Sequence, residues 1–200
     1  KSQYINCMTL DNTGSICIGT DGYGMCRFEG ERFRYITKQN GLQNNAIMAL
    51  YQDSKGAYWF GSYGNGVCRY IDGNFEYFTK QNGLCDDIIY SIVEDNLGNI
   101  WFGSKTNGIS LFDGKKFKNY SVKDGLCSEF IISIIKDYKN NIWIATKTGG
   151  ICKFNGKDFT NFSMKEGFDI HLYGPETPIS VACKKIVELS NKYKVLGMKY

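Results

Sequence analysis

The sequence contains no apolar stretch of about 18 residues, so it offers no transmembrane helix, and we expect no direct membrane insertion. It also lacks a run of basic residues. The 24 Lys and Arg and the 20 Asp and Glu are spread along the chain, which gives no reason to expect nucleic acid as a partner. His171 is the only histidine, and no zinc-ligand spacing, Gly-x-Ser-x-Gly elbow or phosphate-binding loop occurs. We therefore expect no catalytic residues, no metal site and no cofactor.

What the sequence does contain is a unit of 42 residues, present four times between positions 1 and 168 without insertion or deletion. An aspartate, a glycine and a phenylalanine recur once in every unit. They are Asp11, Asp53, Asp95 and Asp137; Gly24, Gly66, Gly108 and Gly150; and Phe33, Phe75, Phe117 and Phe159. A period of this length indicates one supersecondary unit stacked on copies of itself.

The second unit shows the expected secondary structure most clearly. We expect its strands to begin at Ile47, Tyr58, Val67 and Asn74, with turns at residues 53–56, 63–66 and 72–73. Four short antiparallel strands in about 40 residues are typical of a propeller blade. The sequence therefore predicts an all-β fold, a β-propeller of four 42-residue blades, either closed alone or part of a larger ring. A solenoid of stacked sheets fits the period but needs fewer strands per repeat.

The second strand of each unit is apolar on consecutive residues, which indicates burial on both faces. We interpret its aromatic side chains as packing between blades rather than as platforms for a ligand. They are Trp59, Trp101, Trp143, Phe60 and Phe102. In the first unit Cys17 occupies the tryptophan position.

The chain has eight cysteines, and Cys26, Cys68 and Cys152 occupy one equivalent position. Equivalent positions in stacked sheets lie roughly 10 Å apart, beyond the limit of about 7 Å between the Cα atoms of a disulfide. We therefore expect free thiols that pack as small apolar residues. Free thiols favour a reducing compartment or an anaerobic source.

The pattern Asp-x-x-Gly-x-Ile-Trp-x-Gly-[Ser/Thr]-x-x-x-Gly is followed by an aromatic residue, Asp-Gly, Phe and Gly-Leu at residues 95–126, and nearly so at residues 53–84. This pattern resembles the two-component regulator propeller repeat, and the resemblance covers residues 1–168. It implies β-propeller sensor domains, commonly seven-bladed and extracytoplasmic, that feed a histidine kinase or another output. Many members of that family recognise glycans or other small molecules.

Sequence variation within the units is concentrated in the loop between the second and third strands. Divergence in one loop of an otherwise repeated frame is typical of a recognition surface, although exposed loops also drift without function. The candidate ligand-binding residues are Asp21, Tyr23, Tyr63, Asn65, Lys105, Thr106, Asn107, Lys147 and Thr148. The loops between units border the same face, and there Asp86 and Asp87 form either a cation site or a solvated turn.

The repeat pattern stops at residue 169, and we assign residues 169–200 to a tail. Apolar residues at helical spacing predict an amphipathic helix over about residues 178–194. We expect this helix to dock on the final blade or to cover an exposed sheet edge; alternatively, it begins a following domain.

Two functions fit these observations. The first is a non-enzymatic module of a signalling system that senses a glycan or another small molecule. The second is a protein–protein scaffold, in which a partial propeller is completed by self-association or by a partner chain. A third, less favoured possibility is a lyase similar to the streptogramin lyases, whose chemistry requires a histidine; here His171 lies outside the repeats. The resemblance implies a periplasmic or extracellular location, whereas the expected free thiols indicate a reducing or anaerobic one.

Overall fold

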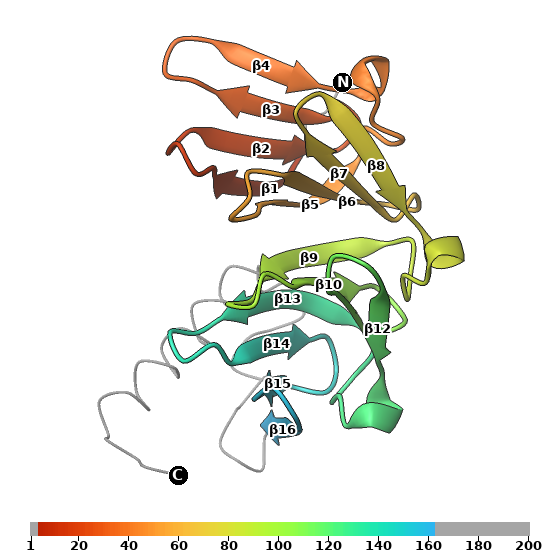
Figure 1. Ribbon diagram of the computed structural model, residues 1–200. Coiled ribbons are helices and arrows are strands. Elements are labelled where there is room, and N and C mark those ends of the chain that lie inside the picture. Colours follow the sequence, from red (N-terminus) through yellow and green to blue (C-terminus); the bar gives the residue numbers. More distant parts are fainter. Residues whose placement is uncertain (1–3, 163–200) are drawn as a thin grey trace.

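The computed structural model describes residues 4–162 and confirms the all-β fold. Its strands form four-stranded antiparallel sheets, which we number blades 1 to 4 in chain order (Figure 1). Blade 1 contains β1 (Ile5–Leu10), β2 (Ile16–Thr20), β3 (Met25–Phe28) and β4 (Phe33–Ile36). Blade 2 contains β5 (Ile47–Gln52), β6 (Tyr58–Ser62), β7 (Val67–Ile71) and β8 (Asn74–Phe78). Blade 3 contains β9 (Ile89–Glu94), β10 (Ile100–Ser104), β11 (Ile109–Phe112) and β12 (Phe117–Tyr120). Blade 4 contains β13 (Ile131–Lys136), β14 (Ile142–Thr146), β15 (Ile151–Phe154) and β16 (Phe159–Phe162).

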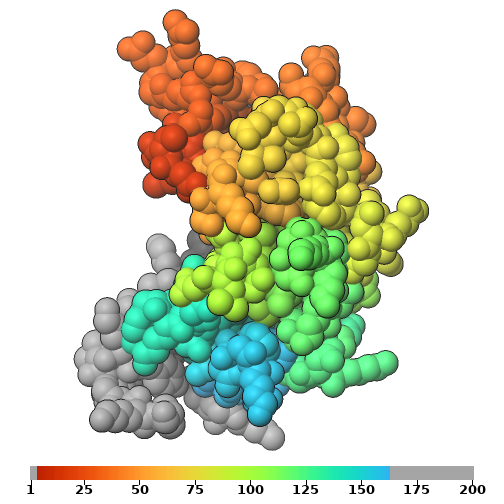
Figure 2. Space-filling model, in the orientation of Figure 1, coloured from red at the N-terminus to blue at the C-terminus, as the bar shows by residue number. Residues whose placement is uncertain are grey.

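Each blade pairs its strands in sequence order, as expected for a propeller blade. The first strands β1, β5, β9 and β13 contact one another from blade to blade. Blades 1 and 4 lie at opposite ends of the stack, so the four blades form an open arc (Figure 1). In the space-filling view the blades follow one another as successive layers of colour (Figure 2).

The helix predicted over residues 178–194 lies outside the described residues. Within residues 4–162, no helix has the length and apolar character needed to cross a membrane.

The second strands carry the core between blades. Trp59 is 2 % exposed, and its ring centroid lies 5.5 Å from that of Phe102 in the next blade. Trp101 repeats this contact with Phe154 at 5.3 Å. The side chains of Phe60 and Trp143 are also buried. The five aromatic residues assigned to the core are therefore placed inside it, where each ring removes a large apolar area from water.

The repeated aspartate holds the tryptophan of its own blade. The indole Nε1 of Trp59 donates to Asp53 at 2.7 Å, and Trp101 donates to Asp95 at 3.0 Å. The other carboxylate oxygen of Asp53 accepts backbone N–H bonds from Lys55 and Ala57 within the β5–β6 turn. One buried carboxylate thus joins the turn to the core, which explains why aspartate recurs in all four units.

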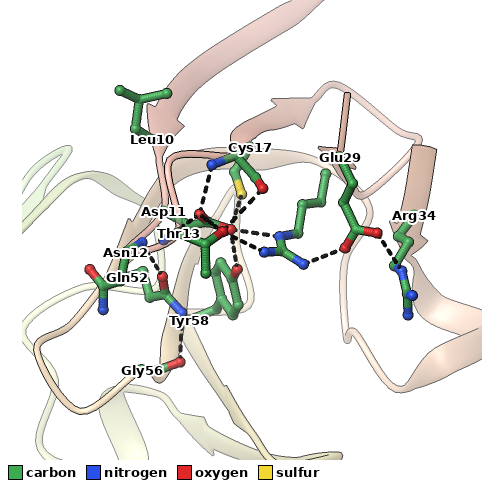
Figure 3. Close-up of polar contacts among 12 residues, drawn as sticks. Leu10, Asp11, Asn12, Thr13, Cys17, Glu29, Arg34, Gln52, Gly56 and Tyr58 are labelled. Carbon is green, nitrogen blue, oxygen red and sulfur yellow. Dashed lines mark hydrogen bonds and ion pairs between the residues drawn. The ribbon is translucent and has the colours of Figure 1, made fainter. Parts of the chain in front are cut away.

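Blade 1 lacks the tryptophan and replaces its hydrogen bond with an ion pair (Figure 3). The guanidinium of Arg27 donates to Asp11 at 2.6 Å, and the hydroxyl of Tyr58 in blade 2 donates to the same carboxylate at 2.9 Å. Burial alone would raise the pKa of Asp11, but the hydrogen bonds from Thr13 and Arg27 outweigh it and hold that pKa well below its usual range. Arg27 also pairs with Glu29.

A short 3-10 helix ends each of the first three blades: η1 (Lys38–Asn40), η2 (Lys80–Asn82) and η3 (Val122–Asp124). Each begins with a capping box, in which a threonine or serine and an Asn or Asp exchange hydrogen bonds with each other's backbone. The N-cap residues are Thr37, Thr79 and Ser121. These caps fix the direction in which the chain leaves one blade and reaches the loops before the next.

The expectation of free thiols is wrong for Cys152, which forms a disulfide with Cys127 across a Cα separation of 6.1 Å. The distance argument applied to equivalent positions, whereas this bond joins two different ones: a residue of β15 and a residue in the loop that leads into its own blade. Among the described cysteines, Cys7, Cys17, Cys26, Cys68 and Cys85 are free. Burial raises the pKa of Cys7 and of Cys68 to about 12, as expected for thiols that serve as packing residues.

Candidate functional site

The loops between second and third strands and the loops between blades form one surface, which we call the loop face. Backbone hydrogen bonds join the two sets of loops. The amides of Gly64 and Gly66 donate to the carbonyl oxygen of Asp87 at 3.0 and 2.8 Å. Gly66 has φ +66°, and a Cβ there would lie 2.1 Å from the backbone oxygen of Phe78, so only glycine fits this turn. The variable loops are therefore mounted on a fixed frame.

Two of the candidate residues lie in contact across the boundary between blades 2 and 3. The ammonium group of Lys105 donates a hydrogen bond to the Tyr63 hydroxyl at 3.1 Å and lies 5.1 Å from the centroid of the Tyr63 ring. This hydrogen bond raises the pKa of Lys105, so the side chain is a cation at neutral pH. Tyr63 is 48 % exposed, which leaves much of its surface available to a ligand.

A stacked pair of aromatic side chains lies between blades 3 and 4. The rings of Tyr90 and Phe130 stack with centroids 5.9 Å apart, and the Lys147 ammonium lies 4.9 Å from the Phe130 centroid. Lys147 was a candidate, but Tyr90 and Phe130 were not, because they lie outside the variable turns between second and third strands. The position of Tyr90 holds Asn6, Met48 and Ile132 in the other units, and this variation is a signal that could have revealed it.

Amide and hydroxyl groups surround these aromatic residues. Asn65 accepts a hydrogen bond from the Asn44 side chain at 3.0 Å, and the Thr148 hydroxyl lies 3.0 Å from that of Ser128. The hydroxyl of Thr106 donates to Asp86 at 2.6 Å, while Asn107 donates to Thr106. Asp86 and Asp87 do not converge on one point, because Asp87 accepts from the backbone amide of Lys80.

The two remaining candidates belong to blade 1. Tyr23 is 40 % exposed, and its amide donates to the Thr20 hydroxyl. Asp21 pairs through its backbone with Ala46 of blade 2 in an isolated bridge. These residues extend the loop face to the first blade, but the closest association of aromatic and cationic groups is in blades 2 to 4.

The loop face is shallow. A hollow of about 10 Å³, room for about one water molecule, is lined by residues of blade 2 and of the loop that leads into it, among them Asn44, Asn65, Phe60 and Cys68. This is below the range of roughly 300–1,000 Å³ usual for sites that enclose a drug-sized ligand. The geometry therefore favours contact with an extended ligand along the surface over the capture of a small one in a closed pocket.

The solved structures similar to this chain include two extracellular domains from B. thetaiotaomicron. One belongs to a protein described as a hybrid two component system; it is 28 % identical, covers 76 % of this chain and 22 % of its own, and has a TM-score of 0.66. The other, described as a one component system, is 24 % identical over 84 % of this chain and 26 % of its own, with a TM-score of 0.67. This chain thus spans about a quarter or less of their length.

Virginiamycin B lyase from Staphylococcus aureus has a similar fold, with 19 % identity over 81 % of this chain and 59 % of its own and a TM-score of 0.66. Identity this low supports a shared fold and nothing about chemistry. No curated protein matches the chain.

The family model for the two component regulator propeller matches residues 41–64, 83–106 and 125–148. Each match begins in the last residues of one blade and ends in the loop after the second strand of the next. The matches therefore include the repeated aspartate and tryptophan of blades 2, 3 and 4. Together with the fold, they confirm the resemblance read from the sequence: three segments, in blades 2, 3 and 4, match the two component regulator propeller repeat.

Proposed function

We propose that this propeller segment is the ligand-sensing part of a signalling receptor, and that a carbohydrate binds to its loop face without being chemically changed. The observation that carries the proposal is the association of Tyr63, Lys105, Tyr90, Phe130 and Lys147 on the variable face of a repeated frame. Aromatic faces pack against the apolar faces of sugar rings, and amide, hydroxyl and ammonium groups hydrogen-bond to their hydroxyls. A face on which these groups recur over blades 2 to 4 suits an oligosaccharide.

Two observations support a location outside the cytoplasm. Two of the similar solved structures are extracellular domains. The Cys127–Cys152 disulfide is of the kind that persists in oxidising compartments. An extracytoplasmic propeller would meet carbohydrates before any cytoplasmic output domain does, as a sensor must.

The test is a thermal-shift screen against oligosaccharides, followed by calorimetry with any that bind. We expect Tyr63→Ala to weaken binding at least about tenfold, equivalent to roughly 1.4 kcal/mol. The matched control is Tyr138→Ala. Tyr138 also lies against a lysine, with the Lys139 ammonium 5.5 Å from its ring centroid, but it belongs to the β13–β14 turn at the other end of the strands. Equal loss in both variants, or no oligosaccharide that binds, would overturn the proposal.

A protein–protein scaffold is the second candidate function. It is favoured by the apolar sheet face that blade 1 leaves uncovered, where Ile5, Met8 and Leu10 are each more than 60 % exposed. A protein partner that raises the melting temperature when no small ligand does would support the scaffold over the sensor.

A further inference from the structure

The Cys127–Cys152 disulfide ties the loop before blade 4 to the core of that blade. Cys127 lies in the β12–β13 loop, on the loop face, and Cys152 lies in β15. Cys152 is fully buried in the apolar cluster between blades 3 and 4, whereas Cys127 is half-buried. The same loop continues to Phe130, whose ring belongs to the proposed ligand surface. A core residue is therefore joined covalently to a loop that carries a ligand-facing side chain.

The β14–β15 turn fits closely against this loop. A Cβ added at Gly149 would lie 2.0 Å from the carbonyl oxygen of Cys127 and 3.0 Å from Cβ of Ser128, so no larger residue fits. The φ angle of Gly149 is not positive, so space rather than backbone conformation requires glycine here. The equivalent residues of blades 2 and 3 are Asn65 and Asn107, which have side chains. The turn and the loop are thus in closer contact in blade 4 than in the two blades before it.

This contact sets the positions of two candidate ligand-binding residues of blade 4. The Ser128 hydroxyl lies 3.0 Å from that of Thr148. The Lys147 amide donates to the carbonyl oxygen of Phe130 at 3.0 Å. The Lys147 ammonium and the Tyr90 ring lie against the Phe130 ring. Movement of the loop would therefore displace the hydroxyl, ammonium and aromatic groups together.

The loop before blade 3 is held without a disulfide. Asp86, at the position of Ser128, accepts hydrogen bonds from the amide and the hydroxyl of Thr106 at 3.0 and 2.6 Å. Hydrogen bonds to an ionised carboxylate are roughly twice as strong as those between neutral groups. Cys85, at the position of Cys127, is free. In blade 4 the disulfide thus supplies the restraint that a carboxylate supplies in blade 3.

We propose that the Cys127–Cys152 disulfide is a positioning bond for the part of the loop face around Phe130, and that its reduction weakens carbohydrate binding there. The inference rests on the proposed function, since a carbohydrate is the ligand. The part of the face around Tyr63 and Lys105 belongs to blades 2 and 3 and does not depend on this bond. The redox state of one bond then selects between a complete ligand surface and one limited to blades 2 and 3.

The reductant that this change requires is a low-molecular-weight thiol. Its thiolate attacks the sulfur of Cys127, the more exposed of the two residues, and forms a mixed disulfide while Cys152 leaves as a thiolate. A second molecule of the reagent attacks the mixed disulfide at the reagent's own sulfur, which releases Cys127 and the oxidised reagent. The reagent loses two electrons to the protein, and the protons that it gives up are taken by the two cysteines.

Hydrogen exchange of two equivalent amides tests the positioning without a ligand. The Lys147 amide donates to Phe130, and one blade earlier the Lys105 amide donates to Ile88 at the same distance of 3.0 Å. We expect dithiothreitol to increase the exchange rate of the Lys147 amide at least about tenfold and to leave that of Lys105 unchanged. Intact-protein mass shows that the bond has been reduced. Equal protection of Lys147 in both redox states would overturn the proposal.

Cys152→Ser removes the bond without a reagent. Ser110 holds the equivalent position in blade 3, and its hydroxyl donates to the cross-strand residue Asn119 at 2.8 Å. Asn161 is the cross-strand partner of Cys152, so the variant has the same hydrogen-bond acceptor available and should fold. The matched control is Cys26→Ser, the same change at the equivalent position of blade 1, where the thiol is free. This control should bind as the native chain does.

Calorimetry with an oligosaccharide that binds the native chain tests the effect on the ligand. We expect Cys152→Ser to weaken binding at least about fivefold. The difference should vanish when both proteins also carry Phe130→Ala and persist when both carry Tyr63→Ala, because the bond acts through the loop of Phe130. A Cys152→Ser variant that binds as tightly as the native chain would refute the positioning role. If no oligosaccharide binds the native chain, the proposed function fails, and the exchange of Lys147 alone decides whether the disulfide positions the loop.

Discussion

At the scale of single residues, the buried carboxylate at the start of each blade is the most informative group. In blades 2 to 4 it binds an indole N–H, and in blade 1 it binds a guanidinium instead. The position of Arg27 is held by Arg69, Leu111 and Lys153 in the other units. Arg69 and Lys153 lie over the rings of Trp59 and Trp143, whereas Arg27 bonds directly to the carboxylate in the blade that has no tryptophan.

This difference predicts different outcomes for two arginines at equivalent positions. Arg27→Met leaves Asp11, whose side chain is fully buried, without its cation; we expect a loss of roughly 3 kcal/mol, the low end for a broken buried pair, because Arg27 is itself about a quarter exposed. Arg69→Met breaks a pair with the half-exposed Glu76 and should cost about 1 kcal/mol or less. Chemical denaturation of both variants measures the difference.

The pH dependence of the Arg27→Met effect follows from the lowered pKa of Asp11. A carboxyl group whose pKa is lower in the folded state contributes stability above its ordinary pKa of 3.8, and this contribution disappears as the pH falls through the folded value. The stability gap between the native chain and Arg27→Met should be constant from about pH 7 to about pH 5 and narrow below about pH 4. If the difference in unfolding free energy between the two proteins increased in acid, Asp11 would not be the group whose charge Arg27 stabilises.

Residues buried between the blades and exposed residues of the loop face should respond differently to substitution. Trp101→Ala removes a fully buried ring and its bond to Asp95, and should cost roughly 3–5 kcal/mol of unfolding free energy. Tyr63→Ala, at an exposed position, should stay within about 0.5 kcal/mol. Urea denaturation of the two variants measures both free energies of unfolding. Similar losses of unfolding free energy in the two variants would show that Tyr63 contributes to the core and not to the loop face.

At the scale of the blade, equivalent positions share geometry even where the residues differ. The Cys127 amide donates to Cys152 Sγ at 3.0 Å, and one blade earlier the Cys85 amide donates to Ser110 Oγ at 2.9 Å. Cys127 and Cys152 are joined by a disulfide, whereas Cys85 and Ser110 lie in the same arrangement with a hydroxyl in place of one thiol. Blade 3 therefore has a cysteine at one of the two positions that form the disulfide in blade 4.

Supplying the missing thiol should complete the bond. We expect Ser110→Cys to form a disulfide with Cys85 under mild oxidation and to raise stability by about 2–4 kcal/mol, a gain that a reductant removes. The change also loses the Ser110–Asn119 hydrogen bond, which offsets about 1 kcal/mol. Ser110→Ala controls for that loss. Intact-protein mass and melting temperature, each with and without reductant, are the measurements; a thiol introduced by Ser110→Cys that stays free after oxidation would refute the equivalence.

Within a blade, the strands could be predicted from the sequence, whereas some contacts between distant residues could not. The strand starts at Ile47, Tyr58, Val67 and Asn74 were predictable, because turn residues and apolar runs are local signals. The Cys127–Cys152 bond was not, since it depends on how the chain folds back onto its own third strand. The contact of Tyr90 with Phe130 joins residues from two successive blades and likewise has no local signature.

At the scale of the whole molecule, blades 2 and 3 are covered by a blade on each side, whereas blade 1 has one neighbour among the described residues. In a stack of repeats, stability is approximately the sum of each unit and its nearest-neighbour interfaces. A blade with one interface should therefore open more often than a blade with two, even though the strands have similar lengths and the same pairing order.

Amide hydrogen exchange can measure this difference. We expect peptides from β1 and β2 to exchange faster than those from β9 and β10, which hold equivalent positions in blade 3. Uniform exchange in both blades of the four-blade chain would mean that the interfaces add little to local stability.

An isoleucine near the start of a first strand lies against a glycine in the second strand of the preceding blade: a Cβ at Gly61 would lie 2.9 Å from Cγ2 of Ile89, and one at Gly103 would lie 2.5 Å from Cγ2 of Ile131. Ile89 and Ile131 face Gly61 and Gly103 in the same manner, so removing one complete period from the middle of the gene rejoins Gly61 to Ile131 without disturbing the fit. Unequal recombination can thus shorten or lengthen the coding sequence in steps of one whole blade.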